Sequence, residues 1–160
     1  MKIRNADIGD LETLSIIESK SYPKTEAASK ESIKNRLNWF NDCFWLLDDY
    51  GEILAFINGM ATDRTDLTDE MYNHPELHNT NGNWLMIFSV VTAPEHRHRG
   101  YASNVMKQVI EDTKIADRRG IVLTCKEPLI PFYSKFGFVN EGLSESTHGD
   151  AVWYQMRLIF

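Results

Sequence analysis

An almost unbroken apolar run from Trp84 to Val91 is the feature that most constrains how this chain can fold. The run has the length of a strand and is too short for a typical helix. Because its apolar residues do not alternate with polar ones, it predicts a strand that is buried on both faces. Such strands lie in the interior of a sheet that helices cover on both sides. We therefore expect an α/β fold built around this strand.

The segments on either side of the run extend this picture. Candidate strands cover residues 2–5, 43–47, 53–57, 121–125, 138–142 and 151–158, and candidate helices cover residues 7–21, 29–40, 101–116 and 129–136. This order predicts a mixed, mostly antiparallel central sheet of about seven strands with helices on both faces. No repeat or linker divides the 160 residues, so we expect a single domain over residues 1–160.

Charge and hydropathy exclude several classes of function. The chain carries 17 Lys and Arg against 23 Asp and Glu, for a net charge of −6. Nucleic-acid binders usually have a basic excess, so no nucleic-acid partner is expected, whereas a cationic substrate suits an acidic protein. No apolar run approaches the roughly 18 residues of a membrane span, and no signal sequence is evident. We therefore expect a cytoplasmic protein without a membrane partner, in which Cys43 and Cys125 form no disulfide.

A polar, acidic segment from Asp63 to Gly82 interrupts the regular elements. Connections of this length are uncommon inside a compact domain, and they are usually either functional lids or disordered segments. The segment predicts a lid over an enclosed site for a small molecule.

The most informative turn is the basic segment Arg97–Ala102, between the apolar strand and an amphipathic helix. The first turn of a helix has unpaired N–H groups and partial positive charge, and a glycine lets a phosphate approach the backbone closely. Neither a Walker loop nor a dinucleotide fingerprint is present. A solvated turn with surface charges is the alternative reading of this segment.

Taken in its order of elements, this turn resembles the acetyl-CoA pyrophosphate loop of the GNAT superfamily of N-acetyltransferases. Arg97, Gly100 and Ala102 match the pattern Q/R-x-x-G-x-G/A. The stretch from Cys125 to Phe138 contains a second motif, C-K-E-x-L-I-P-F-Y followed by F-G-F. This form is similar to the arylalkylamine N-acetyltransferases, the group that includes serotonin N-acetyltransferase.

The resemblance implies that acetyl-CoA is the co-substrate and that no metal takes part. Its pantetheine arm would follow Val90, Val91 and Thr92, beside Thr124 on the neighbouring strand. The residues implied to hold the pyrophosphate are His98, Arg99, Gly100, Tyr101, Ala102 and Ser103. Tyr133 matches the tyrosine that protonates the departing CoA thiolate. The implied reaction is direct acetyl transfer to the primary amine of a small molecule, arylalkylamine-like or polyamine-like, with strand N–H groups near residues 88–90 stabilising the oxyanion.

The chain departs from the serotonin N-acetyltransferases at the proton acceptor. That group has two histidines where this strand has Met86 and Phe88. A primary amine with a pKa near 10 arrives protonated at neutral pH, so another base is needed. The segment around Tyr22 and Glu26 resembles an acidic substrate mouth in bacterial and insect relatives, and it makes Glu26 the predicted base. A solvated Glu26 is the alternative.

Several other assignments stay open. Glu18 and Glu127 are the reserve candidates for the base, and Tyr22, Trp39 and Phe56 are candidates for shaping the acceptor pocket. Cys125 is expected to be an inert thiol, and the pair His96 and His98 is too small a set for zinc. His148 is expected to be a turn residue, and a position at the edge of the cleft is the alternative. Rival functions are acetylation of a protein N-terminus or lysine, and CoA binding without turnover. A second copy of the chain is also a candidate partner, which would make the protein a homodimer.

Overall fold

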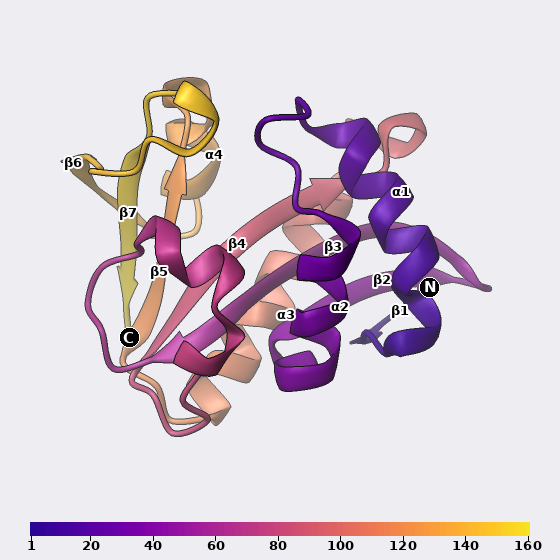
Figure 1. Ribbon diagram of the computed structural model, residues 1–160, viewed down its shortest axis with the longest axis horizontal. Coiled ribbons are helices and arrows are strands. Elements are labelled where there is room, and N and C mark those ends of the chain that lie inside the picture. Colours follow the sequence, from indigo (N-terminus) through magenta and orange to yellow (C-terminus); the bar gives the residue numbers. More distant parts are fainter.

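The computed structural model describes all 160 residues as one seven-stranded sheet with flanking helices (Figure 1). The strands are β1 (Lys2–Asn5), β2 (Phe44–Asp49), β3 (Glu52–Thr62), β4 (Trp84–Thr92), β5 (Gly120–Cys125), β6 (Val139–Leu143) and β7 (Tyr154–Ile159), and the helices are α1 (Leu11–Ser21), α2 (Lys30–Phe40), α3 (Tyr101–Ile115) and α4 (Ile130–Ser134). The strand order is β1-β2-β3-β4-β5-β7-β6, and only β4 and β5 run parallel. The expected mixed, mostly antiparallel sheet is confirmed.

Helices cover both faces of the sheet, as predicted, and each face has its own core. On one face α1 and α2 lie side by side, with Leu14 and Ile33 packed into a smaller cluster with Phe56 of β3. On the other face α3 contributes Val105 and Met106 to the larger cluster. Burial on both faces explains why β4 is apolar along most of its length.

Local sequence signals set the helix ends close to the expected places. The Ser29 hydroxyl accepts a hydrogen bond from the Ser32 N–H and caps α2. Helix α1 ends at Ser21 because Tyr22, which precedes Pro23, takes an extended conformation (ψ 153°). Strand β3 is longer than expected and runs on to Thr62, because residues 58–62 pair with β4 although Asn58 and Gly59 are weak strand formers.

Two irregularities of β4 open the sheet. Strand β4 pairs with β5 only from Trp84 to Met86, and beyond Met86 the two strands diverge (Figure 1). On its other side, β4 pairs Ile87 with Gly59 and Ser89 with Asn58, which leaves Phe88 as an extra, bulged residue. The result is an open edge of β4 from Ile87 onward, facing β5 across a gap.

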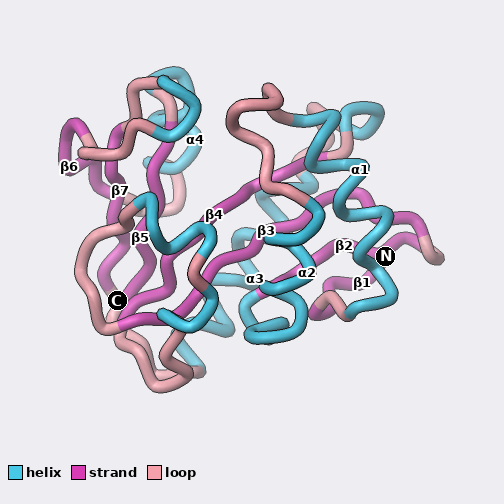
Figure 2. The backbone as a smooth tube through the Cα atoms, in the orientation of Figure 1, coloured by secondary structure: helices cyan, strands magenta, loops and turns pink.

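The polar 63–82 segment packs against the opened part of the sheet. Figure 2 shows it as a loop interrupted by short helical turns, which cover Asp69–Asn73 and Pro75–Leu77. The Asp69 carboxylate accepts hydrogen bonds from the Ser146 hydroxyl (2.5 Å) and the Thr147 N–H (3.1 Å). The segment is thereby fastened to the loop between β6 and β7, which also borders the gap.

Two further expectations from the sequence concern disulfide bonds and membrane-spanning helices. Both cysteines, Cys43 and Cys125, are buried and free, as expected. None of the helices combines the length and the apolar character that crossing a membrane requires.

Candidate active site

A cavity of about 810 Å³ occupies the gap between β4 and β5. Its lining comes from α1 with the following 22–29 segment, α2, the 63–82 segment, the diverging parts of β4 and β5, the turn before α3, the segment that includes Leu129 and Tyr133, and the residues around His148. Pockets of this volume are typical for small ligands. The cavity also reaches Arg97 and His98, so it connects the start of α3 with the acceptor side.

The backbone of the turn before α3 has a conformation suited to binding an anion. His98 (φ 67°) and Gly100 (φ 78°) are both left-handed, and no side chain caps the first turn of α3. A Cβ atom added to Gly100 would meet nothing within 4 Å, so the space beside this backbone is open. Free N–H groups at the start of a long helix attract phosphate.

The residues predicted to hold acetyl-CoA lie along one path, although their role stays a prediction. Val90, Val91, Thr92 and His98 line the cavity, and the next residues, 99–103, continue from it into α3. Thr124 lies on the opposite wall, on β5. The Tyr22 hydroxyl also lines the cavity and donates a hydrogen bond to the Val90 carbonyl (3.0 Å).

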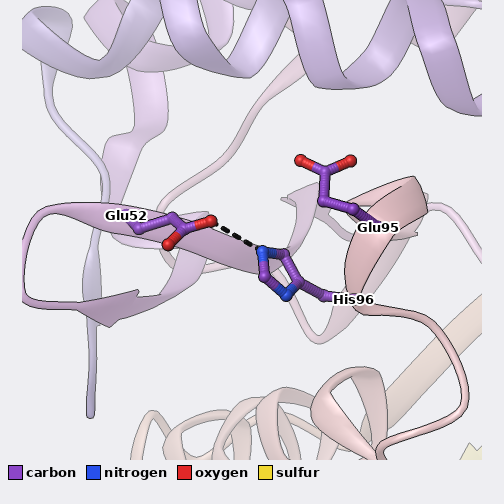
Figure 3. A group of neighbouring side chains, drawn as sticks. All are labelled: Glu52, Glu95 and His96. Atoms are coloured by element: carbon purple, nitrogen blue, oxygen red, sulfur yellow. Dashed lines mark hydrogen bonds and ion pairs between the residues drawn. The ribbon is translucent and has the colours of Figure 1, made fainter.

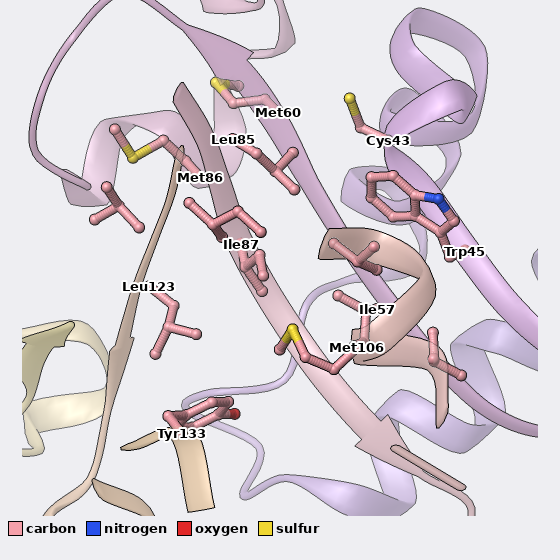
Figure 4. Close-up of a cluster of buried hydrophobic side chains, with 14 of the residues drawn as sticks. Cys43, Trp45, Ile57, Met60, Leu85, Met86, Ile87, Met106, Leu123 and Tyr133 are labelled. Carbon is pink, nitrogen blue, oxygen red and sulfur yellow. The ribbon is translucent and has the colours of Figure 1, made fainter. Parts of the chain in front are cut away.

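Tyr133 lies at the edge of the larger hydrophobic cluster, on the same side as Leu123 (Figure 4). It is 5% exposed, lines the cavity and packs edge-on against Phe132 and Phe138. Burial raises the pKa of its hydroxyl well above the ordinary value of tyrosine. The group therefore stays protonated at neutral pH, which is the state that a proton donor to the thiolate requires.

Cys125 reaches the same cavity but is a poor nucleophile. Burial raises the pKa of its thiol to about 11, so little thiolate is present at neutral pH. The thiol packs 3.6 Å from the sulfur of Met156. This surrounding agrees with the predicted inert thiol.

Glu26 lines the cavity, as predicted, with its carboxylate already paired. The side chain is 7% exposed, and the Lys126 ammonium donates to it at 2.8 Å. His148 Nε2–H donates to the Glu26 carbonyl (2.8 Å), and Gly149 lies against the Glu26 side chain. Glu26 is therefore not the solvated residue of the alternative reading.

His148 is a turn residue, and it is also part of the cavity wall. It lies in a short helical turn, and its ring also lines the cavity and stacks on the ring of Tyr72, with centroids 5.0 Å apart. Tyr72 comes from the 63–82 segment, so this stack adds a second tie between that segment and the β6–β7 loop.

Glu18 is the most deeply buried carboxylate of the site. It is 2% exposed; its Oε2 accepts a hydrogen bond from the Ala28 N–H (3.0 Å), the Ser89 side chain lies beside the carboxylate, and Oε1 makes no hydrogen bond of good geometry. Burial raises the pKa of Glu18 above the usual glutamate value. A carboxylate with a raised pKa is better matched to accepting a proton near neutral pH than an ordinary one.

Arg36 is a functional candidate that the sequence reasoning missed. It is 3% exposed, lines the cavity and lies over the Phe88 ring at 4.6 Å. It donates to the side-chain oxygen of Asn58 (3.0 Å) and to the Tyr72 carbonyl (3.3 Å). The available signal was its position on the apolar stripe of α2, between Ile33 and Leu37.

Some predicted pocket residues lie elsewhere. Trp39 is 59% exposed on α2, and Phe56 is fully buried in the smaller core, so neither lines the cavity and both predictions were wrong. Both belong to regular elements whose inward and outward faces the sequence did not assign. Glu127, a reserve base, lies on an exposed turn outside the cavity.

His96 belongs to a surface group that excludes His98 (Figure 3). Its Nε2 lies 2.7 Å from the Glu52 carboxylate, and the ligand atoms of Glu52, Glu95 and His96 all lie within 4.8 Å of one another. None of the three lines the cavity, so the group is separate from the site described above.

Comparison with known proteins agrees with this geometry. The model of the Acetyltransferase (GNAT) family matches residues 11–138. A curated relative, serotonin N-acetyltransferase of Mesocricetus auratus, is 28% identical over 123 residues, which are 76% of this chain and 54% of that protein. The chain therefore spans about half the length of this relative.

Solved structures share the fold over almost the whole chain. The GphF GNAT-like decarboxylase in complex with isobutyryl-CoA has a TM-score of 0.86 at 16% identity, covering 99% of each chain. The ribosomal-protein-S18-alanine N-acetyltransferase of Escherichia coli has a TM-score of 0.74 at 14% identity, covering 99% of this chain and 92% of that one. At these identities the likeness is one of fold.

Proposed function

Because the chain belongs to the Acetyltransferase (GNAT) family, we propose that it transfers the acetyl group of acetyl-CoA to a primary amine of a small molecule. One observation carries the proposal: a single cavity runs from the turn before α3, along the open edge of β4, to Tyr133 and two carboxylates. This arrangement supplies an anion site, a backbone edge for an extended arm, a proton donor and proton acceptors. These are the groups that acyl transfer from a thioester requires.

The bulge at Phe88 suits the reacting carbonyl. Beyond Met86, the edge of β4 has no ladder partner on β5, so its N–H groups on that side are available to a ligand. N–H groups near residues 88–90 would donate to the thioester oxygen as negative charge develops on it. Tyr133 would then protonate the departing thiolate, and the amide forms without an acyl-enzyme intermediate.

The proton of the amine needs a carboxylate that is free to accept it. The sequence favoured Glu26, but its carboxylate already accepts a hydrogen bond from Lys126. Glu18 lines the same cavity and has a buried oxygen without a hydrogen bond, and its neighbours Tyr22 and Arg36 also line the cavity. We therefore propose Glu18 as the proton acceptor, and Glu26 as the residue that, with Lys126, shapes the mouth of the acceptor site.

The lining of the acceptor side favours a small, partly aromatic amine. Tyr72, Phe88, His148 and Trp153 contribute rings to the wall. Such rings pack well against a flat side chain, which supports an arylalkyl group over an unbranched polyamine. The covering 63–82 segment also favours a small molecule over a protein N-terminus or lysine, because a polypeptide needs an open groove.

Gly100→Val tests the cofactor turn. Because Gly100 is left-handed and faces open space, a valine there should strain the turn and keep a pyrophosphate away from the backbone. We expect acetyl-CoA affinity to fall by about tenfold or more, as measured by calorimetry.

Gly51→Val is the matched control for this change. Gly51 also has a positive φ (94°) and nothing within 4 Å of an added Cβ, but it lies in the β2–β3 turn outside the cavity. It should show a similar loss of thermal stability with parent-like acetyl-CoA affinity. Equal affinity in the two folded variants would remove Gly100 from the cofactor site.

The proposed function itself is tested by release of CoA thiol from acetyl-CoA. The panel holds arylalkylamines, polyamines, peptides with free N-termini and an amine-free control. We expect release that depends on a small-molecule amine. Release with peptides only would favour a protein acetyltransferase, and binding of acetyl-CoA without release under any condition would indicate a binding module.

A further inference from the structure

Arg36 is a buried cation without an ion-pair partner. Its two hydrogen bonds go to neutral oxygens, those of the Asn58 amide and the Tyr72 carbonyl. Its Nε has no partner at all. A guanidinium stays charged in proteins, and a charge removed from water is costly unless an opposite charge compensates it. The wall of the cavity therefore holds a positive charge that the protein leaves without an ion pair.

Glu18 is the complementary group in the same cavity. Its carboxylate is as deeply buried as Arg36, and its unpartnered Oε1 is an acceptor, whereas the unpartnered Nε of Arg36 is a donor. The two charges influence each other but form no ion pair. The site therefore offers the Glu18 carboxylate to a cationic hydrogen-bond donor of a ligand, and the Arg36 guanidinium to an anionic acceptor of the same ligand.

A plain amine satisfies only half of this arrangement. Its ammonium group fits the Glu18 carboxylate, but it brings nothing for the Arg36 guanidinium. An amine with a carboxylate beside it satisfies both groups, because its two charges are separated by only a few bonds. Charge-assisted hydrogen bonds of this kind are the strong ones in buried sites.

We propose that the acceptor is a free amino acid, whose amine is held by Glu18 and whose carboxylate is bound by Arg36. The inference rests on the proposed function and narrows its substrate class. The Arg36 guanidinium lies over the Phe88 ring, and the Tyr72 ring packs against the Phe88 ring with centroids 4.8 Å apart. The two rings provide an apolar surface for the side chain of the amino acid.

Matched substrate pairs test this inference directly. L-tryptophan and tryptamine differ only by the carboxylate, as do L-phenylalanine and phenethylamine, and L-ornithine and putrescine. For each pair, kcat/KM is measured with acetyl-CoA. We expect the amino acid to exceed the plain amine by about tenfold or more in the aromatic pairs.

The amino acid and its plain amine also differ in basicity, but this difference is the same for every variant of the protein. Arg36→Gln therefore isolates the contribution of carboxylate binding. The readout is the ratio of kcat/KM for the amino acid to that for its plain amine, so general damage to the fold cancels. We expect Arg36→Gln to lower this ratio by about ten- to a hundredfold, and Arg36→Lys to retain part of it.

The outcomes distinguish this inference from the proposed function. A ratio that Arg36→Gln leaves unchanged, or parent activity on plain amines only, overturns the amino-acid acceptor and leaves the acetyltransferase intact. Failure to acetylate any member of any pair overturns both. Loss of carbon dioxide from malonyl-CoA without an amine, if Arg36→Gln abolishes it, would assign Arg36 to a carboxylate of the acyl donor and would also overturn the inference.

Discussion

Tyr133→Phe is expected to lower kcat by roughly 10²–10⁴-fold, the usual contribution of a positioned proton donor. The change removes one oxygen and keeps the ring, so the edge-on contacts with Phe132 and Phe138 persist. Because burial keeps the Tyr133 hydroxyl protonated, ionisation of this group should lower parent activity only at alkaline pH. Acetyl-CoA affinity and thermal stability should stay close to those of the parent.

A change of leaving group provides the sharper control for Tyr133. An acetyl thioester of an acidic arylthiol leaves as a stable thiolate and needs little protonation. With such a donor, the penalty of Tyr133→Phe should shrink by an order of magnitude or more. Near-parent turnover of acetyl-CoA by Tyr133→Phe, or an equal penalty with both donors, would remove Tyr133 from the role of the acid.

Glu18→Gln is expected to have an effect of similar size, and Glu26→Gln a smaller one. Glutamine keeps the size of either side chain and removes the charge. We expect Glu18→Gln to lower kcat/KM for the amine by roughly 10²–10⁴-fold at pH 7, with partial recovery above about pH 9, where more free amine is present. Glu127→Gln, on an exposed turn outside the cavity, is the matched control and should behave like the parent.

The pH profile separates a base from a residue that merely packs. Glu18 accepts a proton only as a carboxylate, so parent activity should fall as the pH drops through its pKa. Since burial raises that pKa, the acidic limb should lie above the ordinary glutamate value of about 4.3, and Glu18→Gln should lack this limb. A parent-like Glu18→Gln together with a strongly impaired Glu26→Gln would return the role of the base to Glu26.

Much of the fold could be predicted from local patterns. The apolar run of β4, the Ser29 cap and the stop at Pro23 are signals that depend only on neighbouring residues. The turn at Gly100 could be found in the same way, because a left-handed glycine before a helix leaves a recognisable spacing. These features are local, so the sequence carries them directly.

The acceptor side depends on contacts between distant segments and was harder to predict. Glu26 pairs with Lys126, which lies 100 positions further along the sequence. Arg36 forms hydrogen bonds with Asn58 and Tyr72, and these three residues belong to three separate elements. Glu18, four residues after Leu14 on α1, and Arg36, between Ile33 and Leu37 on α2, each place a lone charge on an apolar stripe. This local signal points inward, but only the tertiary structure shows that the two charges line one cavity.

Transfer of label from [1-¹³C]acetyl-CoA tests the central claim most directly. With an amine that the protein acetylates, we expect one labelled amide on the amine nitrogen for each CoA released. No label should remain on the protein, because the Cys125 thiol is buried and its pKa is raised to about 11. Labelled acetate formed independently of the amine, or a labelled thioester on Cys125, would contradict direct transfer in this cavity.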